Sequence, residues 1–228
     1  MNICLRMLLS FLFVCFGLQA TIIGPTPYVS FADSPFNGTA FGPFYLEDFE
    51  TGSLLTPGVT ASSGVVLSPG SLTDSVDGDD GAIDGSGIGG HSYVVNANTL
   101  LFTFDALALG GHLPTHAGIV WTDIGFDGVS FGVDGVSFSA LDENGDSIGS
   151  IGPFLLGDGS PSGGTAEDRF FGVTNAGGIS QIQITMSNSS DWEVDHLQYG
   201  IEDAPEPASW LSAIGGLSAL VLWRRRRQ

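Results

Sequence analysis

From residue 44 to residue 203 the chain never keeps the helical spacing of apolar residues for more than a turn or two. Short apolar or alternating runs are separated by glycine, aspartate, asparagine and proline, the residues that interrupt strands. The alternation is clearest from Gln181 to Met186, where Ile182, Ile184 and Met186 occupy every second position and share one side of a strand. This pattern predicts an all-β region in which that side faces the core.

The expected strands are 44–50, 64–67, 92–95, 100–105, 117–122, 128–133, 135–141, 147–151, 168–173, 179–187 and 192–199. Asn144-Gly145 lies in the stretch 142–146 and tolerates positive φ, so a hairpin is expected there. Many short strands and abundant glycine predict a two-sheet antiparallel β-sandwich of the jelly-roll type, formed as one domain. A β-helix is the alternative, but no period of solenoid length runs through the chain.

The C-terminal segment 204–228 has three parts in a fixed order. Pro205-Glu206-Pro207 is followed by an uncharged apolar stretch, 208–223, and then by four arginines. The apolar stretch predicts a short transmembrane helix with tryptophans at the interfaces and a cytoplasmic basic end, which leaves the preceding domain on the exported side. The expected membrane-anchor residues are Trp210, Trp223, Arg224, Arg225, Arg226 and Arg227.

This three-part order resembles the PEP-CTERM sorting signal of Gram-negative bacteria. The resemblance implies an exosortase, a membrane-embedded cysteine transpeptidase, that cuts near Pro205, Glu206 and Pro207. It also implies transfer from the inner membrane to the cell surface or the exopolysaccharide matrix. The alternative is a plain C-terminal membrane anchor that contains Pro-Glu-Pro by chance.

The N-terminus also predicts export. Arg6 precedes the apolar stretch 7–18, and cleavage after Ala20 would remove a signal peptide, 1–20, which we expect to form a helix. A lipoprotein that uses Cys15 is a minor alternative. Both cysteines lie in this segment, so the exported domain has no disulfide and depends on its core. The stretch 21–43 is rich in proline, glycine and serine, and we expect an extended leader before a domain at 44–203.

The exported region is strongly acidic. Residues 21–203 hold 24 of the 25 acidic residues, a single arginine and no lysine, so the formal net charge is near −23. A nucleic-acid partner is excluded, because phosphate binding needs lysine and arginine. Such a charge favours Ca²⁺ and other cations. The alternative is an acidic surface that is merely solvated.

An acidic loop at 74–85 is the first candidate metal site. Asp77, Asp79 and Asp84 alternate with glycine, and their oxygens could converge on Ca²⁺ as a structural ion. The loop is not an EF-hand, because Ile88 stands where that motif has a bidentate glutamate. An ordinary acidic turn is an equal alternative.

The first and last expected strands offer a second metal site. The stretches 45–50 and 192–200 resemble the terminal strands of jelly-roll carbohydrate-binding modules, in which a Phe-Glu and a late Asp often hold structural Ca²⁺. The resemblance implies Glu50 and Asp195 as ligands. This chain has Asp195-His196 where the modules more usually have Asp-Asp. The alternative is a pair of surface carboxylates.

Catalytic and histidine motifs lack the context that their chemistry needs. The sequence 128–132 spells G-x-S-x-G, but a strand is expected after it where a nucleophile elbow requires a helix. His112 and His116 are separated by Pro114, which disfavours a helical zinc pair. A loop site with His91 or His196 stays open, although solvated loop histidines are favoured.

These observations predict a non-catalytic cell-surface or matrix protein that binds polysaccharide. The alternatives are a secreted carbohydrate-active enzyme with a carboxylate pair and a purely structural matrix protein. Aromatic side chains could stack on sugar rings, although alternating aromatics in strands are more often core. These aromatic residues are Tyr45, Tyr93, Trp121, Trp192 and Tyr199.

Overall fold

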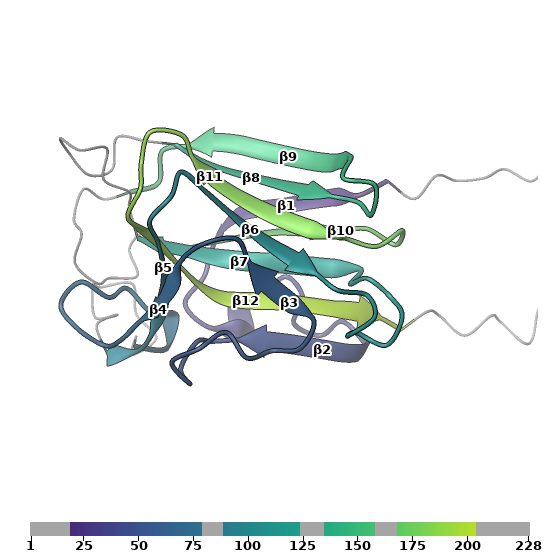
Figure 1. The fold of residues 1–228 in the computed structure, drawn as a ribbon, viewed down its shortest axis with the longest axis horizontal. Helices are drawn as coiled ribbons and strands as arrows, with labels where there is room; N and C mark the ends of the chain where they lie inside the picture. Colours follow the sequence, from purple (N-terminus) through teal and green to yellow (C-terminus); the bar gives the residue numbers. More distant parts are fainter. Residues whose placement is uncertain (1–18, 79–88, 124–134, 158–167, 204–228) are drawn as a thin grey trace, which may run out of the picture.

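The computed structural model of the chain describes residues 19–78, 89–123, 135–157 and 168–203. Its strands form two sheets, and every strand pairing described is antiparallel (Figure 1). The expected all-β, antiparallel two-sheet architecture is therefore confirmed.

Sheet A takes strands from both ends of the domain. Its order is β1 (Thr21–Pro27), β10 (Arg169–Thr174), β7 (His116–Asp123), β12 (Trp192–Glu202), β5 (Ser92–Val95) and β4 (Val65–Leu67), and β2 (Phe41–Glu47) also pairs with β12. Sheet B has the order β3 (Val59–Ala61), β6 (Thr99–Phe104), β11 (Gln181–Met186), β8 (Val136–Leu141) and β9 (Ser147–Phe154). Two short 3-10 helices, η1 (Phe31–Asp33) and η2 (Val76–Gly78), lie in the connections.

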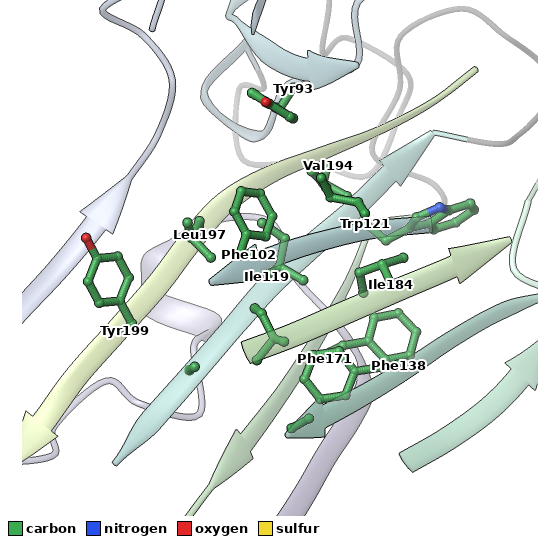
Figure 2. Packing of buried hydrophobic residues seen from close by; sticks show 14 of the residues in the cluster. Tyr93, Phe102, Ile119, Trp121, Phe138, Phe171, Ile184, Val194, Leu197 and Tyr199 are labelled. Carbon is green, nitrogen blue, oxygen red and sulfur yellow. The ribbon is translucent and has the colours of Figure 1, made fainter. Parts of the chain in front are cut away.

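The main hydrophobic core takes side chains from both sheets (Figure 2). In β11 the expected side is buried, with Ile182, Ile184 and Met186 at most 1% exposed. Phe138 of sheet B and Phe171 of sheet A stack with ring centroids 6.1 Å apart. Alternation with a period of two therefore places the apolar side chains of both sheets in this core.

The expected hairpin at 142–146 is confirmed. It joins β8 to β9, and Gly145 has a φ of +81°. The Asp142 carboxylate accepts the backbone N–H groups of Asn144 and Asp146 at 2.8 and 3.0 Å. The turn thus uses glycine for the left-handed position and aspartate to hold the backbone.

The segment 21–43, expected to be an extended leader, belongs to the folded domain. Its first residues form β1, an edge strand paired with β10, and Pro25 and Pro27 are compatible with an edge position. Its later residues lie on the outer face of sheet A, the face turned away from sheet B. There Tyr28 and Phe36 form a second apolar cluster with Val76, Val120 and Phe170.

Phe170 fits this outer face because its neighbours lack side chains. A Cβ atom added to Gly118 would lie 2.3 Å from the Phe170 ring, and one added to Gly172 would lie 2.7 Å from it. The ring therefore occupies the space that side chains at these two positions would need. Tyr28 stacks on the same ring and Phe36 meets it edge-on, with centroid distances of 6.0 and 5.3 Å.

Several expectations concern the remaining parts of the chain. Residues 1–18 of the expected signal peptide, the expected strand 128–133 and the segment 204–228, with the expected sorting signal and transmembrane helix, lie outside the described residues. Ala20, the expected cleavage position, is half-buried and packs against the main core. Among the helices of the described ranges, none has the length and apolar character needed to cross a bilayer.

Candidate functional site

The pairing of β12 changes in the middle of the strand. On one edge, Trp192 to Val194 pair with β5, and pairing with β2 begins at Leu197. On the other edge, β12 has one more residue than β7 between the pairs Asp195↔Val120 and Gln198↔Gly118. This bulge centres on His196, whose φ is +44°.

The bulge changes which side chains face outward. Val194 and Leu197 belong to the main core, whereas Asp195, His196 and Gln198 bond with groups on the outer side of sheet A. Without the extra residue, alternation would turn His196 towards sheet B. The bulge therefore brings two adjacent polar side chains to the same face.

Asp195 is completely buried but well bonded. One carboxylate oxygen accepts the His196 N–H at 2.7 Å, and the other accepts the Val76 N–H at 2.9 Å and the Ser75 hydroxyl at 3.1 Å. Burial raises the pKa of Asp195 to about 8, although His196 and the backbone donors oppose this shift. These contacts fix η2 on the outer face of the sheet.

His196 connects the surface to a buried chain of polar groups. Its Nε2 atom lies 3.1 Å from Oδ2 of Asp77, and its Nδ1 atom lies 2.9 Å from the Tyr28 hydroxyl. Gln198 donates its amide N–H to that hydroxyl at 2.9 Å and accepts the Ser34 hydroxyl at 2.5 Å. The Asp77 side chain is 39% exposed and that of His196 only 4%, so the chain reaches solvent at Asp77.

The acidic surroundings determine the charge of this imidazole. Burial lowers the pKa of His196, but the hydrogen bond with Asp77 and the charges of Asp195, Asp77 and Asp48 outweigh burial and raise it overall. Burial also raises the pKa of Tyr28, whose hydroxyl therefore stays protonated. The outer face thus holds an imidazole whose protonated form is favoured by the neighbouring carboxylates.

The described residues contain one group whose side chains are close enough to share a metal ion. Ligand atoms of Asp77, Asp195 and His196 all lie within 4.8 Å of one another. The structure therefore brings together one aspartate from the expected acidic loop and one from the expected strand pair. Asp79 and Asp84 lie outside the described residues, so the Ca²⁺ loop at 74–85 stays a prediction.

Glu50, the other expected strand ligand, has a different partner. Its carboxylate accepts the His91 N–H at 2.5 Å and lies 3.2 Å from the Nδ1 atom of the same residue. This contact is partly exposed, and Glu50 is not a member of the Asp77, Asp195 and His196 group. Glu50 thus connects the end of β2 to the start of β5.

Sequence reasoning missed two residues of this site, namely Tyr28 and Gln198. It left His196 open as a loop ligand and favoured a solvated histidine, but His196 is 3% exposed. The departure from Asp-Asp to Asp195-His196 was the available signal. Tyr28 lies in the expected leader, and no local pattern indicates that its side chain contacts His196 of β12.

A second buried carboxylate precedes this site on β12. Glu193 accepts the Asp74 N–H at 2.9 Å and the Ser92 hydroxyl, and it lies opposite Asp123 of β7. Burial raises its pKa to about 7, and the charges of Asp123 and Asp191 add to the shift. Glu193 fixes the segment before η2 to the sheet, as Asp195 does for η2 itself.

A pocket of about 480 Å³ is formed by the β6–β7, β8–β9 and β10–β11 connections together with β12. Its polar side chains include Asp105, His112 and Glu143, and its apolar ones include Leu113 and Ile201. The backbone of Gly177 and Gly178 also lines it. The pocket therefore combines charged, peptide and apolar groups.

The expected core position of the strand aromatics is confirmed. Trp121, Trp192 and Tyr199 are fully buried, and Tyr93 is 6% exposed. Tyr45 is half-buried and packs on Tyr199 with ring centroids 5.2 Å apart. Four of these side chains therefore belong to the core, and Tyr45 packs at its edge.

Comparisons with protein-family models, with curated proteins and with solved structures found no match to this chain.

Proposed function

We propose that this protein is an exported, non-catalytic jelly-roll module that binds polysaccharide at the cell surface or in the extracellular matrix. The observation that carries the proposal is the pocket of about 480 Å³ between the strand connections. Binding sites on rigid β scaffolds are commonly formed by connecting loops. The pocket also lies within the size range of small-molecule sites.

The lining of the pocket suits a sugar ring. A sugar presents hydroxyl groups at its rim and C–H groups on its faces, so it needs polar and apolar contacts together. Asp105 and Glu143 can accept hydroxyl hydrogens, His112 can donate or accept, and Leu113 and Ile201 can contact the C–H face. The lining of the pocket thus offers both kinds of contact.

The charge of the domain narrows the class of sugar. Residues 21–203 carry a formal net charge near −23, and the pocket itself holds two carboxyl side chains. Anionic glycans rich in uronate or sulfate would be repelled by this field. We therefore expect a neutral polysaccharide or one that bears amino groups.

Export and processing complete the proposal. The apolar stretch 7–18, Pro205-Glu206-Pro207, the apolar stretch 208–223 and the four terminal arginines support signal-peptide cleavage, a transient inner-membrane stage and exosortase processing. An acidic module released there would meet the polysaccharides of the cell surface or matrix. The proposed ligand and the proposed destination therefore agree.

A glycan array of neutral, amino-bearing and uronate-rich polysaccharides tests this function with the purified full-length protein. We expect binding to a neutral or amino-bearing glycan, and at least a tenfold loss of affinity in Glu143→Gln, because the amide removes a charge-assisted acceptor. Glu50→Gln is the matched control, since Glu50 contacts His91 and does not line the pocket.

The same assay also tests the two alternative functions, a carbohydrate-active enzyme and a purely structural matrix protein. Release of reducing sugar that depends on Asp105 or Glu143 would replace the binding module with a carbohydrate-active enzyme, because a carboxylate pair can act as acid and base. Equal absence of binding across all three glycan classes would favour a purely structural matrix protein. Binding that Glu143→Gln leaves unchanged would place the glycan elsewhere on the molecule.

A further inference from the structure

We propose that Asp77, Asp195 and His196 bind one divalent ion of the zinc class, in preference to Ca²⁺. The inference rests on the outer face of sheet A and does not depend on the glycan pocket. It assigns a metal-ion class to a group that combines a partly exposed carboxylate, a buried carboxylate and a buried imidazole.

The distances between the ligand atoms suit a small ion. Zinc binds imidazole nitrogen and carboxylate oxygen at about 2.0 to 2.2 Å, so tetrahedral ligand atoms lie about 3.3 Å apart. The Nε2 atom of His196 already lies 3.1 Å from Oδ2 of Asp77, and the oxygen of Asp195 completes a group within 4.8 Å. To enclose an ion of that size, the widest separation in the group, at most 4.8 Å, would contract to about 3.3 Å.

The chemistry of the ligands separates zinc from calcium. Ca²⁺ takes six to eight oxygen ligands at about 2.3 to 2.6 Å, whereas this group offers two carboxylates and a nitrogen. Imidazole is a ligand that zinc and its transition-metal neighbours accept readily. The imidazole of His196 thus favours a zinc-class ion over Ca²⁺ in this group.

The polar groups behind His196 can support a metal-bound imidazole. If Nε2 binds the ion, Nδ1 carries the hydrogen and donates it to the Tyr28 oxygen, 2.9 Å away. Tyr28 then donates to the amide oxygen of Gln198, and the Gln198 amide nitrogen donates to Ser34. Every pair of heavy atoms in this arrangement is already within hydrogen-bond distance, and only the Gln198 amide has to turn over.

The site is also open on one side. Asp195 and His196 close the inner wall, with exposures of 0% and 3%, whereas the Asp77 side chain is 39% exposed. An ion can therefore enter beside Asp77, and water can complete its coordination, as in three-ligand zinc sites. When both carboxylates are ionised, a bound dication balances their two negative charges.

Titration of the chelator-treated, purified full-length protein with Zn²⁺ and, separately, Ca²⁺ tests the site. Calorimetry should show one Zn²⁺ per chain, bound at least 100-fold more tightly than Ca²⁺ at the same site. Co²⁺ should give visible d–d absorption bands of a nitrogen- and oxygen-ligated ion. Asp77→Asn, which alters a partly exposed side chain, should weaken Zn²⁺ at least tenfold, and His196→Asn should abolish the Co²⁺ bands.

His91→Asn is the matched control, because His91 and Glu50 form another contact between an imidazole and a carboxylate, separate from the proposed site. It should leave Zn²⁺ affinity and the Co²⁺ spectrum unchanged. The proposal is overturned if Ca²⁺ binds as tightly as Zn²⁺, if no Zn²⁺ binds, or if Asp77→Asn leaves the affinity unchanged. Loss of Zn²⁺ binding in His91→Asn would assign the ion to the other contact.

Discussion

Phe170 and Phe171 are adjacent on β10 but belong to the two different faces of sheet A. Phe171 lies in the main core against Phe138 of sheet B, whereas Phe170 lies on the outer face against Tyr28 and Phe36 (Figure 2 shows Phe171 and Phe138). The inner face is covered by sheet B, whose strands also alternate inward- and outward-facing side chains. The outer face is closed by irregular chain, and it is there that the polar site lies.

The difference follows from what each covering layer can offer. A strand facing the core presents an apolar side chain at every second position, so the inner face excludes charge. The irregular segment from Tyr28 onward and η2 present hydroxyl, carboxylate and backbone N–H groups beside apolar ones. Sheet A therefore has an apolar inner face that packs in the core and an outer face that carries polar and ionisable groups.

Replacing each phenylalanine with alanine tests this contrast and should give the largest effect. Phe171→Ala removes a ring from the main core and should lower the free energy of unfolding of the whole domain by about 3 to 5 kcal/mol. Phe170→Ala should cost less global stability, because the outer layer can open locally, but it should expose the segment 28–44. Urea denaturation measures the first effect and hydrogen exchange the second.

Zn²⁺ affinity should also distinguish Phe171→Ala from Phe170→Ala. Folded Phe171→Ala should keep the proposed site, because its side chain lies on the opposite face from His196. Phe170→Ala should weaken the site, because Tyr28 stacks on that ring and contacts His196. Equal global destabilisation by both changes, with identical hydrogen exchange at 28–44, would show that the two faces unfold as one unit.

The two faces also differ in how far the sequence could predict them. The alternation in β11 gave its inward positions, and Asn144-Gly145 gave the hairpin. The extra residue at His196 could not be found, because a bulge depends on pairing with β7 and leaves no local pattern. The covering of the outer face could not be predicted either, because the segment around Pro25 resembles a linker and becomes an edge strand only through its pairing with β10.

The pH dependence of stability should show the next largest effect. Burial raises the pKa of Glu193 from its ordinary 4.5 to about 7, so the folded chain binds this proton more tightly than the unfolded chain does. The associated stability is fully present below pH 4.5 and is lost as the pH rises through about 7. In chelator, urea denaturation should show a loss of up to about 3 kcal/mol from this group between pH 4.5 and 8.

Glu193→Gln should remove the part of the stability loss between pH 4.5 and 8 that comes from Glu193. Glutamine resembles the protonated glutamate and keeps an oxygen that accepts hydrogen bonds from Asp74 and Ser92. Asp123 and Asp191 face Glu193 and add to its shift, and Asp195 contributes in the same direction, so some slope should persist. Asp203→Asn, a change in an exposed carboxylate, should leave the slope as in the parent protein. An unchanged slope in Glu193→Gln would show that Glu193 is ionised in the folded chain throughout this range.

A pair of tyrosine changes compares the two faces at the scale of one hydroxyl group and should give the smallest effect. Tyr28 on the outer face bonds with His196 and Gln198, whereas Tyr199 in the main core donates to the Pro57 carbonyl at 2.6 Å. Tyr28→Phe should lower the free energy of unfolding by about 1 to 2 kcal/mol, because it leaves buried partners without a hydrogen bond. Tyr199→Phe should cost about 1 kcal/mol, because its hydrogen bond to Pro57 is only partly buried.

Metal binding should separate these two variants. Tyr28→Phe removes the group that would accept the Nδ1 hydrogen of a metal-bound His196, so Zn²⁺ affinity should fall about 10- to 100-fold. Tyr199→Phe should bind Zn²⁺ as the parent protein does, since its hydroxyl lies on the other face of β12. If both variants lose stability alike and neither loses Zn²⁺ affinity, the Tyr28 hydroxyl serves packing alone. The polar chain from Ser34 to Asp77 would then be structural, like the core on the opposite face.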